Sequence, residues 1–192
     1  SLGKIIISHT GMFIDNSREL LNKIIEPINQ VCVFRINNLK NKPLSLEFKK
    51  DYFNYQLFPI RYMVFNYLDQ HGIFLYYFPG SGKSLTSLGI AQNLGLETII
   101  ICPTNIYDQW SNLYVKKYSP YLPKTKVLKL SEAQTYLSSK SDMWFNNKTL
   151  ILDEAHNILF LEKTKKLALT RLLSRFSKRI ILSATPIVSR IN

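Results

Sequence analysis

Three short polar segments of this chain, each directly after an apolar run, carry residue types that bind and cleave phosphate esters. The first is Gly-Ser-Gly-Lys-Ser, after the run 73–78 and before a helix predicted over 83–94. Its glycines permit a tight turn whose N–H groups converge on phosphate oxygens, and the helix N-terminus adds its positive dipole. The lysine is suited to the β- and γ-phosphates, and the hydroxyl of the last serine is suited to Mg²⁺. The candidate triphosphate cradle is Gly80, Ser81, Gly82, Lys83, Ser84 and Leu85.

The second segment is Asp-Glu-Ala-His, which follows the apolar run 149–152. Open α/β sheets bind ligands beyond the carboxyl ends of their strands, so this position favours chemistry. Asp153 and Ser84 are the predicted metal-binding residues. The Asp153 carboxylate is predicted to contact the metal through a water molecule. Glu154 is predicted to orient and deprotonate the attacking water. His156 completes this catalytic group, although we interpret it as a coupling residue and not as a base.

The third segment, Ser-Ala-Thr, closes the apolar run 179–182. It places two hydroxyls, Ser183 and Thr185, near the expected end of a bound triphosphate. Hydroxyl groups there relay the state of a nucleotide by hydrogen bonding, so both are predicted coupling residues.

Each segment alone has an ordinary explanation. Tyr77 occupies the place where the full phosphate-loop pattern has glycine, and an acidic pair after a strand often only begins a solvated helix. All three segments nevertheless occur in order, each at a strand end. This conjunction favours a nucleoside triphosphatase with ATP and Mg²⁺ as cofactors.

The three segments resemble motifs I, II (in its DEAH form) and III of the first RecA-like motor domain of superfamily 2 helicases and translocases. The stretch 99–104, followed by Gln109 and Trp110, is similar to motif Ia of the DNA-translocating branches, which include Swi/Snf-type remodellers, restriction-enzyme motors and large-DNA-virus helicases. The resemblance implies nucleic-acid contacts from Pro103 and Thr104. It also implies an ATP-dependent DNA helicase or translocase. A DEAH-type RNA helicase, and a P-loop ATPase or binding module that does not act on nucleic acid, remain alternatives.

The chain departs from the family upstream of the phosphate loop. A glutamine that reads adenine usually stands in a Leu-x-Pro-x-Gln setting, whereas this chain has Arg61 there. Gln56 is not an obvious substitute, so adenine selectivity is open. The aromatic residues of 52–67 are mostly predicted to be core, although one of them could stack on the base. Trp110 is predicted to be a packing anchor for its helix.

Composition is consistent with a polyanionic partner. The chain has 192 residues with a formal net charge of +12, and such basic domains attract nucleic acid. No apolar run reaches the length of a membrane span, and no signal-peptide layout is evident. Cys32 and Cys102 are predicted to be buried thiols of a reducing compartment. We therefore expect an intracellular protein that is not secreted.

The predicted fold is α/β, a RecA-like P-loop domain whose mainly parallel sheet is covered by helices on both faces. Residues 51–192 form this domain, and residues 1–50 form a small α/β extension that we interpret as scaffold in preference to a nucleic-acid-binding module. The second RecA-like domain of the parent chain is expected to be missing. An isolated fragment would then hydrolyse ATP weakly, because that partner supplies an arginine finger. The predicted strands are 4–8, 31–36, 73–78, 98–102, 126–130, 149–152 and 179–183, and the main helices are 17–27, 83–94, 105–117, 131–139 and 162–176. In the last of these helices an apolar stripe is predicted to pack on the sheet, formed by Leu169, Leu172, Leu173 and Phe176.

Overall fold

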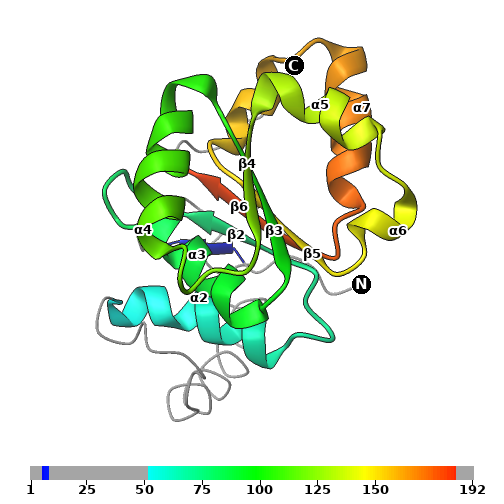
Figure 1. The fold of residues 1–192 in the computed structure, drawn as a ribbon. Helices are drawn as coiled ribbons and strands as arrows, with labels where there is room; N and C mark the ends of the chain where they lie inside the picture. Colours follow the sequence, from blue (N-terminus) through cyan, green and yellow to red (C-terminus); the bar gives the residue numbers. More distant parts are fainter. Residues whose placement is uncertain (1–5, 9–51, 185–192) are drawn as a thin grey trace, which may run out of the picture.

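The computed structural model describes residues 6–8 and 52–184 and contains one six-stranded sheet (Figure 1). Every pair of neighbouring strands is parallel. The strand order is β1-β2-β6-β5-β3-β4. The strands are β1 (Ile6–Ser8), β2 (Gly72–Tyr76), β3 (Glu97–Cys102), β4 (Thr125–Lys129), β5 (Lys148–Leu152) and β6 (Lys178–Ser183).

Helices cover both faces of the sheet, as parallel strands require (Figure 1). One face carries α2 (Asn54–Phe65) and α3 (Lys83–Leu94), which pack against each other. The other carries α5 (Leu130–Ser138) and α7 (Lys163–Ser174), also in mutual contact. Shorter elements complete this set: η2 (Thr104–Ile106), η3 (Gln109–Val115), α4 (Lys116–Tyr118), α6 (Asp142–Phe145) and η4 (Ala155–Phe160).

Two apolar cores result from the alternation of side chains along each strand. In β3, Ile100 and Cys102 pack into the core beneath α2 and α3, while Ile99 and Ile101 pack beneath α5 and α7. Four consecutive side chains of β3 are thus buried, which is why its sequence is continuously apolar. The predicted apolar stripe of 162–176 is confirmed, since Leu169 and Leu173 of α7 and Phe176 just after it are buried in the second core, and Leu172 packs against that core.

The predicted α/β fold class is confirmed, and the strand boundaries differ by only a few residues from those expected. The predicted single helix over 105–117 is instead a succession of 3₁₀, π-helical and α-helical turns. Propensity does not distinguish these hydrogen-bonding patterns, because packing decides them. The short helix α6, before β5, was not predicted.

The predicted extension is largely outside the described residues. Of its predicted strand 4–8, residues Ile6–Ser8 are described as β1, which pairs with β2 at the edge of the sheet. The predicted helix 17–27 and strand 31–36, together with Cys32, lie outside the described residues. None of the described helices has both the length and the apolarity needed to cross a membrane.

Cys102 is the cysteine that the structure describes, and it is a buried free thiol at the end of β3. Burial, with a further contribution from the nearby charge of Asp153, raises the pKa of Cys102 to about 12. The thiol therefore stays protonated at neutral pH and acts as a small apolar core group. This agrees with the prediction of a buried thiol.

Candidate functional site

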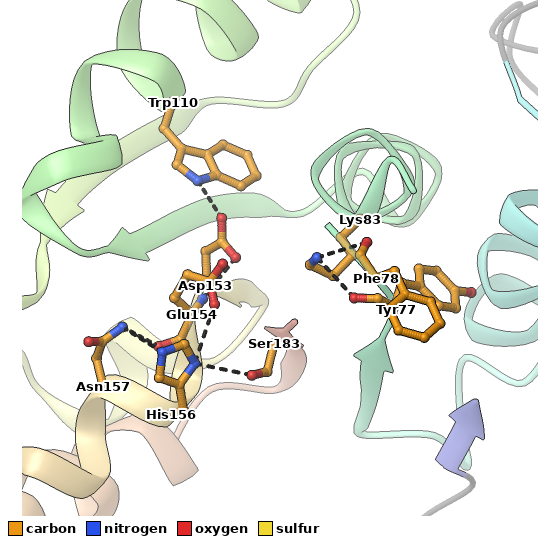
Figure 2. Close-up of polar contacts among 9 residues, drawn as sticks. All are labelled: Tyr77, Phe78, Lys83, Trp110, Asp153, Glu154, His156, Asn157 and Ser183. Carbon is orange, nitrogen blue, oxygen red and sulfur yellow. Dashed lines mark hydrogen bonds and ion pairs between the residues drawn. The ribbon is translucent and has the colours of Figure 1, made fainter. Parts of the chain in front are cut away.

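The glycine turn lies between β2 and α3 and has the backbone conformation that its sequence predicts. Gly80 and Gly82 have φ angles of 78° and 81°, in the left-handed region that favours glycine. Lys83 begins α3 and is buried, with 9% of its surface exposed. Its Nζ donates to the carbonyl oxygens of Tyr77 at 3.1 Å and Phe78 at 3.4 Å (Figure 2). The ammonium group is thus held beside the turn.

Helix α2 holds this turn from outside. The Ser81 carbonyl accepts hydrogen bonds from the Tyr55 hydroxyl at 2.9 Å and from Gln56 Nε2 at 3.1 Å. The Gln56 Oε1 accepts from the backbone N–H of Phe53 at 2.9 Å, and the side chain is only 2% exposed. Both ends of the Gln56 amide are therefore satisfied, and the side chain fixes the loop backbone.

This contact predicts different tolerances at the two glycines. A Cβ at Gly82 would lie 2.2 Å from Gln56 Nε2, whereas a Cβ at Gly80 meets nothing within 4 Å. Both alanine variants bear the left-handed backbone cost of about 1–2 kcal/mol. Gly82→Ala must also displace the buried amide, which adds about 1–3 kcal/mol. The unfolding temperature and the nucleotide affinity should both fall further for Gly82→Ala than for Gly80→Ala.

The control for this comparison removes the obstacle. In a Gln56→Ala background the Cβ at position 82 has room. The difference in unfolding temperature and in nucleotide affinity between the two glycine variants should therefore become smaller. An equal difference in both backgrounds would show that Gln56 does not limit this site.

Asp153 follows β5 and is the most enclosed carboxylate of the candidate site. It is 6% exposed, and its Oδ2 accepts a hydrogen bond from Trp110 Nε1 at 2.8 Å. Its Oδ1 accepts from the Glu154 backbone N–H at 2.8 Å. Burial raises the pKa of Asp153, whereas these two hydrogen bonds and the charge of Lys83 oppose that rise.

Glu154 has a backbone conformation that side-chain-bearing residues rarely adopt. Its φ is 46° and its ψ is 51°, in the left-handed region. Non-glycine residues kept there cost free energy and concentrate at functional sites. Its Oε2 lies 3.3 Å from His156 Nδ1, an ion-pair distance, but no aligned hydrogen bond within the described residues reaches that oxygen.

His156 links the acidic segment to the end of β6. Its Nδ1 lies 3.2 Å from Ser183 Oγ, and its Nε2 lies 3.5 Å from Asn157 Nδ2 (Figure 2). The Asn157 amide also donates to the Glu154 carbonyl at 2.9 Å. Two of the predicted coupling residues, His156 and Ser183, therefore lie in contact. Thr185, the third, lies outside the described residues.

The strand order brings the three segments to one edge of the sheet. β6 lies between β2, which precedes the glycine turn, and β5, which precedes Asp153. Tyr76 and Ser183 are paired in register, so the ends of β2 and β6 are level. Figure 2 shows the Lys83 amino group on the side of its helix that faces Asp153. The candidate nucleic-acid residues Pro103 and Thr104 follow β3, the strand beyond β5, and Thr104 is exposed.

The few oxygen ligands at this edge are typical of a Mg²⁺ site, and not of a metal site formed by protein side chains alone. No three His, Cys, Asp or Glu side chains converge as a metal site in the described part of the chain. Mg²⁺ usually keeps several waters and takes one or two protein oxygens plus substrate phosphates. Asp153 is buried at this edge with a hydrogen bond at each oxygen, and one buried carboxylate is compatible with such a site.

These features define a RecA-like α/β domain with a glycine turn and an acidic segment at the carboxyl edge of its sheet. No protein-family model matches the chain. A protein of Acanthamoeba polyphaga mimivirus assigned as an ATP-dependent RNA helicase is 30% identical to it over 139 residues. That match covers 72% of this chain and 30% of the mimivirus protein, so the chain spans less than a third of that relative.

Sequence reasoning missed two contributors to the site. Gln56 was considered only as a reader of adenine, whereas it is bonded to the loop. Trp110 is buried, as expected of a packing anchor, but it also donates to Asp153. Both contacts join segments that are distant in sequence, and only the periodic burial of their helices could have indicated them. Arg61, at the expected glutamine place, has a buried Nε without a hydrogen-bond partner within the described residues.

Proposed function

We propose that this chain is the first motor domain of an ATP-dependent DNA helicase or translocase with a DEAH-type motif II. The observation that supports it best is that Lys83 and Asp153 lie at the same edge of the sheet, with the Lys83 amino group on the side of its helix that faces Asp153 (Figure 2), although they follow different strands. The similarity to a mimivirus protein assigned as an ATP-dependent RNA helicase supports an ATP-driven motor on nucleic acid.

In the proposed reaction the chain binds the triphosphate of ATP on the backbone N–H groups of the glycine turn. Lys83 leaves the carbonyls of Tyr77 and Phe78 and pairs with the phosphate oxygens. Ser84 and Asp153 would hold Mg²⁺, which would neutralise charge on those oxygens. Glu154 orients a water whose oxygen attacks the γ-phosphorus, and its carboxylate takes the proton as ADP departs.

The contact between His156 and Ser183 supports a coupling role. His156 Nδ1 lies 3.3 Å from Glu154 Oε2 and 3.2 Å from Ser183 Oγ, so one imidazole nitrogen lies between the predicted base and the end of β6. A change at the γ-phosphate that moves Glu154 would thus alter the contacts of Ser183 at the end of β6. Thr185 follows Ser183 by two residues in the sequence. We propose that these contacts report the nucleotide state to a second RecA-like domain of the same parent.

The nucleic-acid substrate is proposed from the motif Ia resemblance at 99–104, which favours DNA. The name of the mimivirus relative specifies RNA, so RNA is the second candidate. The net charge of +12 supports either polyanion. We also propose an intracellular location, where ATP and nucleic acid occur together.

The test is ATP turnover by the parent protein that contains this chain, with duplex DNA, with single-stranded RNA and with neither. Stronger stimulation by DNA is expected. Stronger stimulation by RNA would replace the DNA assignment with the RNA helicase alternative. A turnover rate indifferent to both would instead favour a P-loop ATPase or binding module. A Thr104→Ala variant should weaken stimulation without altering the basal rate.

A further inference from the structure

The indole of Trp110 forms a hydrogen bond with the side chain of Asp153. Its Nε1 donates to Asp153 Oδ2 at 2.8 Å, and the ring is fully buried (Figure 2). The contact joins η3 to the end of β5 across 43 positions of sequence. The predicted role as a packing anchor explains the burial of the ring, but not the direction of its N–H group.

Asp153 is held at both oxygens by neutral donors. Oδ1 accepts from the Glu154 backbone N–H and Oδ2 from Trp110. A carboxylate oxygen has room for two acceptor contacts, so each oxygen keeps one direction free. Two fixed donors therefore set the plane of the carboxylate and decide where its remaining lone pairs point.

The helix that carries Trp110 is unusual. η3 is π-helical over Gln109–Val115, and Trp110 is its second residue. π-Helical turns are rare and occur frequently at functional sites, because they change the direction of a side chain within a helix. The ring of Tyr114 packs edge-on against Trp110, with centroids 5.2 Å apart. The indole orientation is thus fixed by the helix and by this neighbour.

We propose that Trp110 is a positioning residue for the binding of Mg²⁺ with nucleotide. Its N–H group fixes the Asp153 carboxylate so that the free lone pairs meet the hydration shell of the metal. This inference rests on the proposed function, because it requires Asp153 to serve a metal-bound triphosphate. Outer partners that orient metal-binding groups typically change metal affinity by ~10- to 100-fold when removed.

A purely structural role makes a different prediction. A buried indole N–H usually finds an acceptor, and Asp153 could be that acceptor with no consequence for the metal. Substitution would then change stability but leave the dependence on Mg²⁺ as it was. The two roles therefore separate in a metal titration.

The experiment compares Trp110→Phe with Tyr114→Phe in the purified chain. Both retain an aromatic ring in η3, but only the first removes the donor to Asp153. The affinity for a fluorescent ATP analogue is measured over a series of Mg²⁺ concentrations and in EDTA. For Trp110→Phe we expect the half-effective Mg²⁺ concentration to rise ~10- to 100-fold, with the affinity in EDTA unchanged. Tyr114→Phe should match the unsubstituted chain.

A double-mutant cycle tests whether Trp110 acts through Asp153. In an Asp153→Ala background, Trp110→Phe should add no further change to the Mg²⁺ dependence. An unshifted Mg²⁺ dependence in Trp110→Phe, or an equal shift in both backgrounds, would overturn the inference. Failure of the unsubstituted chain to bind the analogue with Mg²⁺ would overturn the proposed function, and this inference with it.

A measurement on the unsubstituted Trp110 covers the case in which Trp110→Phe does not fold. The chain has two tryptophans, so a proton–nitrogen NMR spectrum contains two indole N–H signals. Asp153→Ala should move one of them strongly and leave the signal of Trp144 in place. Mg²⁺ with the ATP analogue should move the same signal. Insensitivity of both signals to Asp153→Ala would contradict the contact itself.

Discussion

Substitution of Lys83 by alanine is expected to reduce the affinity of this chain for ATP by about 100-fold or more. A charge-assisted hydrogen bond contributes about 1.5–3 kcal/mol, and Lys83 is proposed to contact two phosphate groups. The residue is buried at the start of α3, so another lysine is poorly placed to replace it. Calorimetric titration with ATP and Mg²⁺ measures the loss.

The matched control is Lys116→Ala, which removes the same charge from an exposed position in α4. It lowers the net charge equally and should leave ATP affinity within about 2-fold, because exposed charges are strongly screened. Lys83 also bonds two loop carbonyls, so thermal unfolding must show that Lys83→Ala is folded. A folded Lys83→Ala variant with unchanged ATP affinity would break the assignment of the phosphate loop.

Glu154→Gln should separate binding from turnover. The amide has nearly the shape of the carboxylate, so it can keep the contact with His156, but it cannot take a proton from water at neutral pH. Loss of a general base lowers turnover by about 10²–10⁴-fold. In the parent protein, steady-state ATP hydrolysis should fall by that factor while the dissociation constant for ATP stays close to its original value.

Glu162→Gln is the control for this substitution. It removes a carboxylate charge from an exposed residue that pairs with Lys165 at the start of α7. Its turnover should equal that of the unsubstituted protein. If Glu154→Gln also retained full turnover, Glu154 would have to be withdrawn as the base, although the cradle at Lys83 could still stand.

The sequence alone was sufficient to predict the sheet, because its strands are buried on both sides. Ile99, Ile100, Ile101 and Cys102 form an unbroken apolar run, a pattern that a helix of the same length rarely needs. The glycine turn was predictable for a related reason, since two glycines before a lysine allow the left-handed conformations that Gly80 and Gly82 adopt. Because the strands are parallel, the polar segments that follow them are expected to lie at the same edge of the sheet.

The contacts around these segments could not be predicted in the same way. Gln56 and Ser81, or Trp110 and Asp153, meet only because α2 and η3 pack at particular rotations on the sheet. Those rotations depend on tertiary packing, which neither periodicity nor propensity encodes. The π-helical turns of η3 and the left-handed backbone of Glu154 are local examples, because neither is the conformation that residue propensity favours.

The two bonds that Tyr55 and Gln56 make to the Ser81 carbonyl have a thermodynamic consequence for ligand capture. A phosphate loop that is already immobilised loses little conformational entropy when the nucleotide binds, since that entropy was lost during folding. Association should therefore be rapid and should lack a slow isomerisation phase. Removal of both hydrogen bonds would leave the loop to be ordered when the nucleotide binds. The entropy of binding would then be more unfavourable.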